Sequence, residues 1–145
     1  MIYDSIRMES CELDSIYDKY KDSIIIAVSP SYYLERNEGS CRLVMIYKKH
    51  KKYLIKDCTG AGSAHRCALQ GLVFAAEQIK IPKPIIFVAA APFGFKKALK
   101  GKGMNPDLWN IFFDVLKEKG CPSVTEIVVP DGSRKIEGLC RESAR

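Results

Sequence analysis

The stretch IIFVAAAPFGF, residues 85–95, decides how the surrounding sequence folds. Its first half is apolar and rich in β-branched residues, which is typical of a strand buried on both faces of a sheet. Pro84 precedes the stretch, and Pro92 and Gly94 end it, so the strand is short. In an α/β domain, polar side chains that handle a ligand usually gather where such a strand ends. Here three alanines, residues 89–91, occupy that place.

The sequence after this stretch alternates between helical and strand-like segments. They are a short basic helix in FKKALKG (95–101), a helix in NPDLWNIFFDVLKEKG (105–120), a strand in SVTEIVV (123–129) and a closing helix in RKIEGLCRESAR (134–145). In the second segment we expect Asn105 to cap the helix, Pro106 to occupy its first turn and Gly120 to end it.

Three strand-like runs stand before the stretch without a helix between them. They are SIIIAVS (23–29), CRLVMIYKK (41–49) and KYLIKDCT (52–59). The last two are joined by KKHKK (48–52), a hairpin turn whose lysines we expect to be solvated. Ser63 then caps a helix through HRCALQGLVFAAEQIKI (65–81). Three successive strands predict an antiparallel start to the sheet.

Residues 1–22 precede these strands. Apolar residues recur there at mostly three- and four-residue steps, at Ile2, Ile6, Leu13, Ile16, Tyr17 and Tyr20. This spacing predicts an amphipathic helix over residues 1–22, followed by one domain over residues 23–145. The whole order predicts an α/β fold with a mixed five-stranded sheet, three antiparallel strands followed by two α/β crossovers, and helices on both faces.

Lysine and arginine outnumber the acidic residues, 23 to 17, which gives a net charge of +6 and a pI near 9.0. Such a surplus suits a polyanionic partner but is also common in proteins without one. No apolar run has the length of a membrane span, about 18 residues, and residues 1–22 lack the apolar core of a signal peptide. We therefore expect a soluble, intracellular protein, cytoplasmic or nuclear, with no membrane partner.

The six cysteines are scattered without a CxxC pair, and the chain has two histidines. This pattern fits neither a zinc site nor a disulfide scaffold, so we expect free, mostly buried thiols and no cofactor. As nucleophiles, Ser63 and Cys67 lie nearest to His65, but residues two apart on a helix point away from each other. Trp109 has apolar neighbours along its helix, which indicates a core position.

Four short segments of the sequence occur in an order that bears on the fold. They are AVSPS (27–31), HRCALQGLVFAAEQI (65–79), DLWNIFFDVL (107–116) and GLCRESAR (138–145). In this order they are similar to the first-strand TDGS, the first core helix, the DLW helix and the final CDELAR-type helix of the ribonuclease H family. No single phrase is specific, but their spacing over residues 23–145 resembles one such domain. The resemblance implies a ribonuclease H-like fold.

In that family, four carboxylates hold two Mg²⁺ ions that activate water and stabilise the leaving oxygen of a phosphodiester. The resemblance places these four positions at Ser29, Ala68, Ala90 and Arg141. None of the four is acidic, and only Glu137 and Glu142 flank the last of them. The resemblance therefore implies an inactive nuclease, not an enzyme, with neither catalytic residues nor a metal.

The substrate groove of the family contacts phosphates and 2′-hydroxyls by shape rather than by base sequence. By resemblance, the candidates for nucleic-acid binding are Arg66, Lys96, Lys97, Lys100, Lys102, Arg134, Lys135 and Arg141. Arg141 in place of an acid suits a phosphate, because guanidinium pairs with phosphate directly. We expect binding of an RNA duplex or an RNA/DNA hybrid without cleavage, and the alternative is an ordinary solvated charged face.

A second hypothesis is a structural or protein-interaction module, similar to the inactive ribonuclease H-like domains of reverse transcriptases. Tyr32 and Tyr33, in the loop after the first strand, favour it because exposed aromatics are common at interfaces. Tyr3, Tyr17 and Tyr20 would contribute likewise unless they pack under the sheet. An inactive member of this family also suggests a viral or retroelement origin. Phosphate binding weakens steeply with salt and an apolar interface does not, which separates the two hypotheses.

Overall fold

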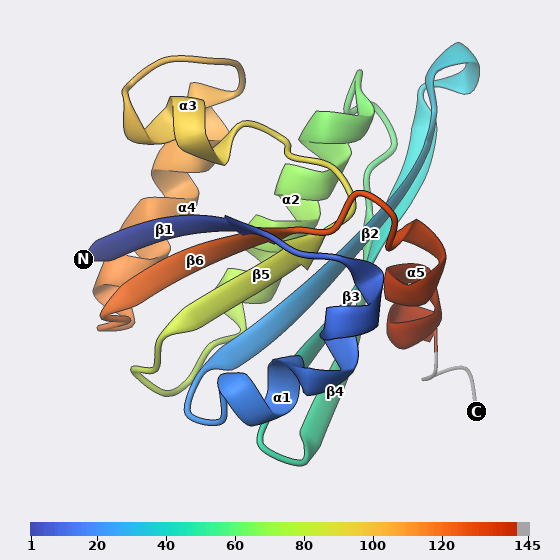
Figure 1. Cartoon of the computed structure of the whole chain (residues 1–145). Coiled ribbons are helices and arrows are strands. Elements are labelled where there is room, and N and C mark those ends of the chain that lie inside the picture. The colour runs from blue at the N-terminus through green and yellow to red at the C-terminus, as the bar shows by residue number, and fades with distance from the viewer. Residues whose placement is uncertain (142–145) are drawn as a thin grey trace.

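Six strands form one mixed sheet in the computed structural model, which describes residues 1–141 (Figure 1). The strands are β1 (Ile2–Arg7), β2 (Ile24–Tyr33), β3 (Glu38–Tyr47), β4 (His50–Asp57), β5 (Ile85–Ala89) and β6 (Ser123–Val128). Their order across the sheet is β1-β6-β5-β2-β3-β4. The pairs β2–β3 and β3–β4 are antiparallel, whereas β1, β6, β5 and β2 run parallel. The predicted α/β class is confirmed.

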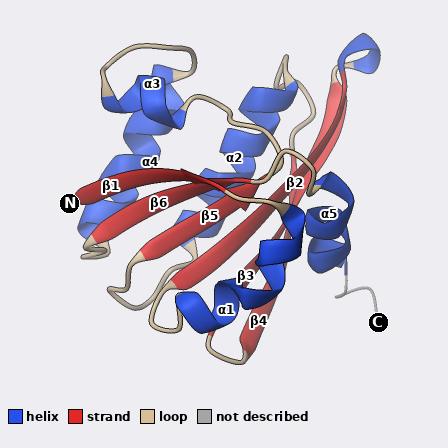
Figure 2. Cartoon of the chain, in the orientation of Figure 1, coloured by secondary structure: helices blue, strands red, loops and turns tan. Residues whose placement is uncertain are grey.

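Helices cover both faces of this sheet (Figure 2). They are η1 (Ser10–Ser15), α1 (Ile16–Lys19), η2 (Leu34–Arg36), α2 (Ala64–Glu77), α3 (Phe95–Leu99), α4 (Pro106–Glu118) and α5 (Ser133–Arg141). Helices α2, α3 and α4 pack on one face, and α1 and α5 pack on the other. In the part of the chain that the structure describes, no helix is both long and apolar enough to span a bilayer.

The prediction of an amphipathic helix over residues 1–22 is wrong. The segment begins with strand β1, which pairs in parallel with β6, and continues with the two short helices η1 and α1. Isoleucine and tyrosine favour strands, and β6 offers an edge to which a further strand can pair. A new helix starts at Ser10 because Glu9 and Glu12 form a capping box, in which the Glu9 N–H donates to Glu12 Oε2 at 2.7 Å. The sheet consequently has six strands instead of the predicted five.

The elements predicted between residue 23 and residue 141 are present, but β2 extends through Tyr33, so Tyr32 and Tyr33, predicted in a loop, form the end of this strand. Strands β2 to β4 form the antiparallel start, α2 leads to β5, and α3 and α4 lead to β6. Ser63 caps α2, since its Oγ accepts a hydrogen bond from the Arg66 N–H at 3.1 Å. Asn105 precedes α4, but its side chain does not cap that helix.

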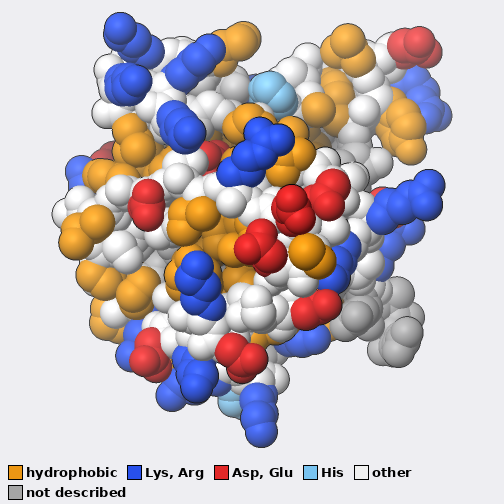
Figure 3. Space-filling view, viewed as in Figure 1, with side chains coloured by type: hydrophobic (Ala, Val, Ile, Leu, Met, Phe, Trp, Pro, Cys, Tyr) orange, Lys and Arg blue, Asp and Glu red, His pale blue; other side chains and the backbone are white. Residues whose placement is uncertain are grey.

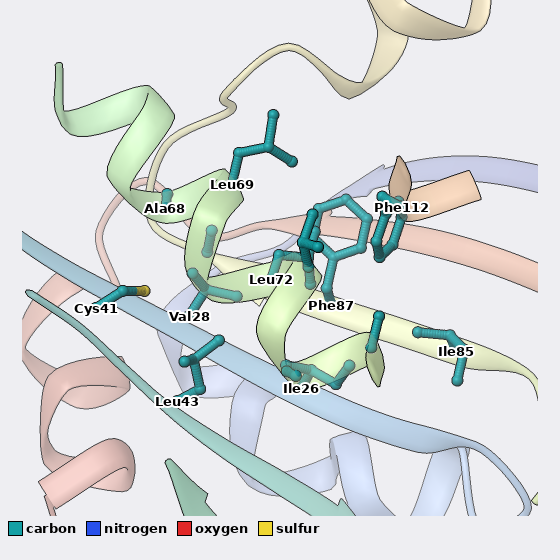
Figure 4. Packing of buried hydrophobic residues seen from close by; sticks show 14 of the residues in the cluster. Ile26, Val28, Cys41, Leu43, Ala68, Leu69, Leu72, Ile85, Phe87 and Phe112 are labelled. Carbon is teal, nitrogen blue, oxygen red and sulfur yellow. The ribbon is translucent and has the colours of Figure 1, made fainter. Parts of the chain in front are cut away.

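Alternation along the central strands divides the core into two layers. From β2, Ile26 and Val28 face α2, whereas Ile25 and Ala27 face α5. Figure 4 shows the α2 layer, where Leu72 of the helix lies against side chains of the sheet. Strand β2 is therefore held in place by side-chain packing on both faces of the sheet.

Helix α2 approaches β3 at Gly71. A Cβ at this position would lie 2.5 Å from the Cys41 Sγ and 2.7 Å from the Cys41 Cβ. No real Cβ tolerates such distances, so glycine is what allows the helix to pack this closely on the strand.

Candidate functional site

A pocket of about 240 Å³ opens where the pairing between strands β2 and β5 ends. Their last paired residues are Ala27 and Val88. Beyond this pair β2 continues along β3 and β5 continues along β6, so the two strands diverge toward opposite sides of the sheet. Such a divergence creates a crevice at the carboxyl ends of the strands, which is the usual ligand position in open α/β sheets.

The pocket brings together three of the four positions that the resemblance pointed to. Its lining residues are Val28, Ser29, Pro30, Ala64, His65, Ala68, Ala89, Ala90, Ala91, Phe93, Ser133 and Ile136. Ser29, Ala68 and Ala90 thus come from β2, α2 and the end of β5 to one place. The three alanines that end the 85–95 stretch all line this pocket.

The chemistry of the lining is mainly that of methyl groups. Ser29, His65 and Ser133 are its polar side chains, and the described residues contribute no carboxylate to it. Nor do any three His, Cys, Asp or Glu side chains among residues 1–141 come together as a metal site would require. Mg²⁺ needs anionic oxygen ligands, so this lining does not fit a pair of magnesium ions.

Arg141, the fourth position, does not line the pocket. It lies at the far end of α5, where its Nη2 is 3.1 Å from Glu137 Oε1. Helix α5 presents Ser133 and Ile136 to the pocket instead, about two turns earlier. The structure therefore does not support the idea that Arg141 replaces a metal-binding acid within the pocket. Glu142 lies outside the described residues.

Two more of the predicted phosphate-binding residues are engaged within the protein. Arg66 donates to both carboxylate oxygens of Asp107, at 3.2 and 2.8 Å, and to Asn105 Oδ1 at 3.0 Å. This pairing raises the pKa of Arg66 and lowers the pKa of Asp107. Lys135 Nζ lies 3.0 Å from Asp14 Oδ1. A guanidinium already held by a bidentate carboxylate has little capacity left for a phosphate.

The remaining lysines of the prediction gather on and after α3. Lys96, Lys97, Lys100 and Lys102 are all exposed. Among residues 1–141, no ion pair joins any of them to a carboxylate. Figure 3 shows Lys and Arg side chains clustered over this part of the molecule, at the upper left. Arg134, at the start of α5, is exposed as well.

The α3 segment, residues 93–104, is held firmly against the core. Phe95 is buried and meets Tyr3, Phe87 and Trp109 at ring-centroid distances of 6.3, 5.3 and 5.8 Å. The Lys102 N–H donates to the Lys97 carbonyl oxygen at 2.9 Å, which closes the loop after the helix. The lysines therefore project from a fixed backbone.

Phe93 connects the α3 segment with the pocket. It lines the pocket and also stacks on Trp109, with ring centroids 5.7 Å apart and planes 16° apart. Trp109 is 1% exposed, as its predicted core position requires. Sequence reasoning missed the role of Phe93, although it follows the three alanines directly in the 85–95 stretch.

The two tyrosines predicted at an interaction surface differ from each other. Tyr32 is half-buried, and its hydroxyl bonds to the Asn37 side chain and accepts from the Gly62 N–H at 2.9 Å. Tyr33 is 56% exposed at the tip of the β2–β3 hairpin, next to Leu34, which is 71% exposed. Tyr33 is therefore the better candidate for a contact with another molecule.

The thiols are not arranged for nucleophilic chemistry at the pocket. Cys67 is fully buried and its pKa is lowered by a hydrogen bond with Cys58, whereas His65 is exposed at the pocket rim. All six cysteines are free and five are buried, which confirms the sequence prediction for the thiols. Ser63 uses its hydroxyl as a helix cap.

No protein-family model matches this chain, and comparison with curated proteins gives no match.

Proposed function

We propose that the chain is a ribonuclease H-like protein that binds an RNA duplex or an RNA/DNA hybrid and does not cleave it. The observation that carries this proposal is the α3 segment with its four exposed lysines, fixed beside a pocket whose described lining holds no carboxylate. Neither catalysis nor a metal is part of the proposal.

The arrangement of strands β2 to β6 supports the relationship. They form three antiparallel strands followed by two α/β crossovers, the order predicted from the sequence and the one that a ribonuclease H-like fold requires. Three residues picked by that resemblance, Ser29, Ala68 and Ala90, line one pocket although they lie far apart in the sequence.

The charge distribution supports binding of a phosphate backbone. Lysine ammonium groups on a fixed segment neutralise phosphates and release the counterions condensed on the nucleic acid. Because such contacts read backbone shape and charge, we expect little dependence on base sequence. Phe93 holds the α3 segment at the rim of the pocket, so a duplex lying on the lysines would also cover the pocket.

Fluorescence anisotropy with a labelled RNA/DNA hybrid, an RNA duplex and single strands tests the proposal, with Mg²⁺ present so that cleavage is scored together with binding. The test variant replaces the four lysines of the α3 segment with glutamine. We expect the slope of log K against log salt concentration to become shallower by up to about 4, about one for each lost phosphate contact.

The matched control removes four positive charges elsewhere, from the exposed residues Lys19, Lys21, Lys80 and Lys117. It should bind more weakly only through the smaller net charge. Equal losses in both variants would contradict a specific role of the α3 segment, and Mg²⁺-dependent cleavage would contradict the inactive site.

The alternative is a protein-interaction module, and one observation favours it. Tyr33 and Leu34 expose apolar surface at the tip of the β2–β3 hairpin, the part of the chain where interface contacts were predicted. Tyr3 does not add to this surface, because it packs against Phe95 and Phe113. Binding of a protein partner that persists in high salt and is lost on Tyr33→Ser would support this alternative.

A further inference from the structure

The turn between β3 and β4 carries a run of positive charge that the α3 site does not use. Lys48, Lys49, His50, Lys51 and Lys52 are consecutive and all exposed. Tyr47 pairs with His50, so the turn consists of Lys48 and Lys49 alone. This turn lies at the end of the sheet where β2 starts, because Ile46 pairs with Ile25, whereas the pocket lies farther along β2, at residues 28–30. In Figure 1 the α3 segment and this turn stand at opposite ends of the molecule.

The backbone of this turn is unfavourable for its residues. Lys48 has a φ of 56°. The other non-glycine residues with positive φ among residues 1–141 are Asn37 and Asn105, and asparagine tolerates this region far better than lysine. A two-residue hairpin turn with positive φ at its first central residue normally has glycine there. Lysine at this position therefore makes the protein less stable than glycine would.

The charges of the turn add a second cost. Lys51 and Lys52 follow closely after Lys48 and Lys49, and like charges this close repel one another. Within residues 1–141, no ion pair joins Lys48 or Lys49 to a carboxylate. The Lys48 ammonium instead stands 5.5 Å from the centroid of the Tyr47 ring. Backbone strain at Lys48 and charge repulsion between Lys48 and Lys49 occur together at one exposed point, a combination found where a site serves a ligand.

The chemistry of the neighbours limits what this ligand is. Tyr47 and Tyr53, which flank the basic run, are half-buried, and no large exposed apolar side chain lies between them. The turn therefore has no group to insert into a bilayer or into an apolar protein interface. A cluster of lysines with no exposed apolar side chain among them is suited to the phosphates of a nucleic acid. Binding of these phosphates is favoured by the release of condensed counterions.

We propose that the β3–β4 turn is a second nucleic-acid contact, at which Lys48 and Lys49 bind backbone phosphates of a duplex. The site is separate from the α3 segment and does not depend on it. A protein with phosphate contacts at opposite ends joins two duplexes, or two segments of one duplex.

Two turn variants separate the charge from the strain. Lys48→Gly removes both, so it should raise the melting temperature by about 2–4 °C while it weakens binding to a short labelled RNA duplex. Lys49→Gln removes a charge at a residue without positive φ, so it should weaken binding at an unchanged melting temperature. Each should make the salt slope shallower by about 1. Lys117→Gln, at an exposed lysine of α4, is the control and should keep the melting temperature and weaken binding less than either turn variant.

The same turn variants, made in the protein that lacks the four lysines of the α3 segment, distinguish the two sites. A further loss of affinity there supports the turn site even if the α3 variant alone binds normally. If Lys48→Gly stabilises the protein and binds like Lys117→Gln, the turn is merely strained and the proposal falls. Binding to phosphatidylserine vesicles without binding to the duplex would also overturn it.

Discussion

Glu126 of β6 is buried, with 2% of its surface exposed, and it accepts a hydrogen bond from Ser5 Oγ at 2.6 Å. Burial raises the pKa of the Glu126 carboxyl, because the charged form loses hydration, and the Ser5 hydrogen bond and the positive charge of Lys96 oppose this effect. The carboxylate is buried beside Ser5 of β1 and close to Lys96 of α3. Because its pKa differs between the folded and the unfolded chain, its ionisation is linked to folding.

This linkage has a defined sign. The folded protein holds the Glu126 proton more tightly than the unfolded chain, so stability is highest below the unfolded pKa, about 4.5, and falls as pH rises through the raised folded pKa. We expect Glu126→Gln, which keeps an acceptor for Ser5, to stabilise the protein at neutral pH and to change little at pH 4. Urea unfolding across this pH range measures the effect. Glu118→Gln, at an exposed position, is the control, and an equal gain in both variants would contradict the role of burial.

At the scale of single residues, the sequence predicted the pocket better than it predicted the ion pairs. Ser29 and Ala68 were placed by motifs and Ala90 by its position at the end of a strand, and such placements carry over when the elements are in order. The pair of Arg66 with Asp107 joins residues 41 positions apart, and no local pattern announces it. Arg141 was predicted from its place in the segment 138–145, but whether a helical residue reaches a pocket depends on which turn of the helix faces it.

The packing of α2 on β3 leads to a prediction at the scale of elements. Gly71→Ala should destabilise the protein by about 1–3 kcal/mol, because the new Cβ collides with Cys41 and this outweighs the better helix propensity of alanine. Gly138→Ala is the matched change in α5, where nothing lies within 4 Å of the new Cβ, and it should stabilise by up to about 1 kcal/mol. Urea unfolding of the two variants checks the difference, and destabilisation of similar size in both would contradict it.

Element prediction succeeded where local signals agree with the tertiary environment. Helix α2 has a serine cap and an apolar stripe, and β5 is a short apolar run between prolines, so both were correctly predicted. Residues 1–22 mislead because three short elements, β1, η1 and α1, together imitate the period of one helix. The edge of β6 decides in favour of a strand there, and a partner more than a hundred residues away is not visible in a local window.

For the whole molecule, the two-layer core predicts how the thiols react. Cys11 is exposed, and the other five cysteines are buried in the two layers. Burial also raises the pKa of several of them, Cys140 to about 12, which keeps them as unreactive thiols. We expect one of six thiols to react rapidly with an aromatic disulfide reagent in the native protein, and all six in denaturant.

A Cys11→Ser variant provides the control. It should show no rapid reaction in the native protein, while its five remaining thiols still react in denaturant. Rapid reaction of two or more thiols in the native protein would show that one of the core layers opens readily.

The pairing of β1 with β6 has a consequence for how the protein is made. Ile2 is in register with Ser123, so strand β1 is synthesised more than a hundred residues before the strand with which it pairs. Strands β2 to β5 can assemble in the meantime, since their partners appear in the order of translation. Until β6 is synthesised, the backbone of β1 lacks its hydrogen-bonding partner and Ile2 is exposed. Chaperones that recognise extended apolar segments can bind β1 during this time.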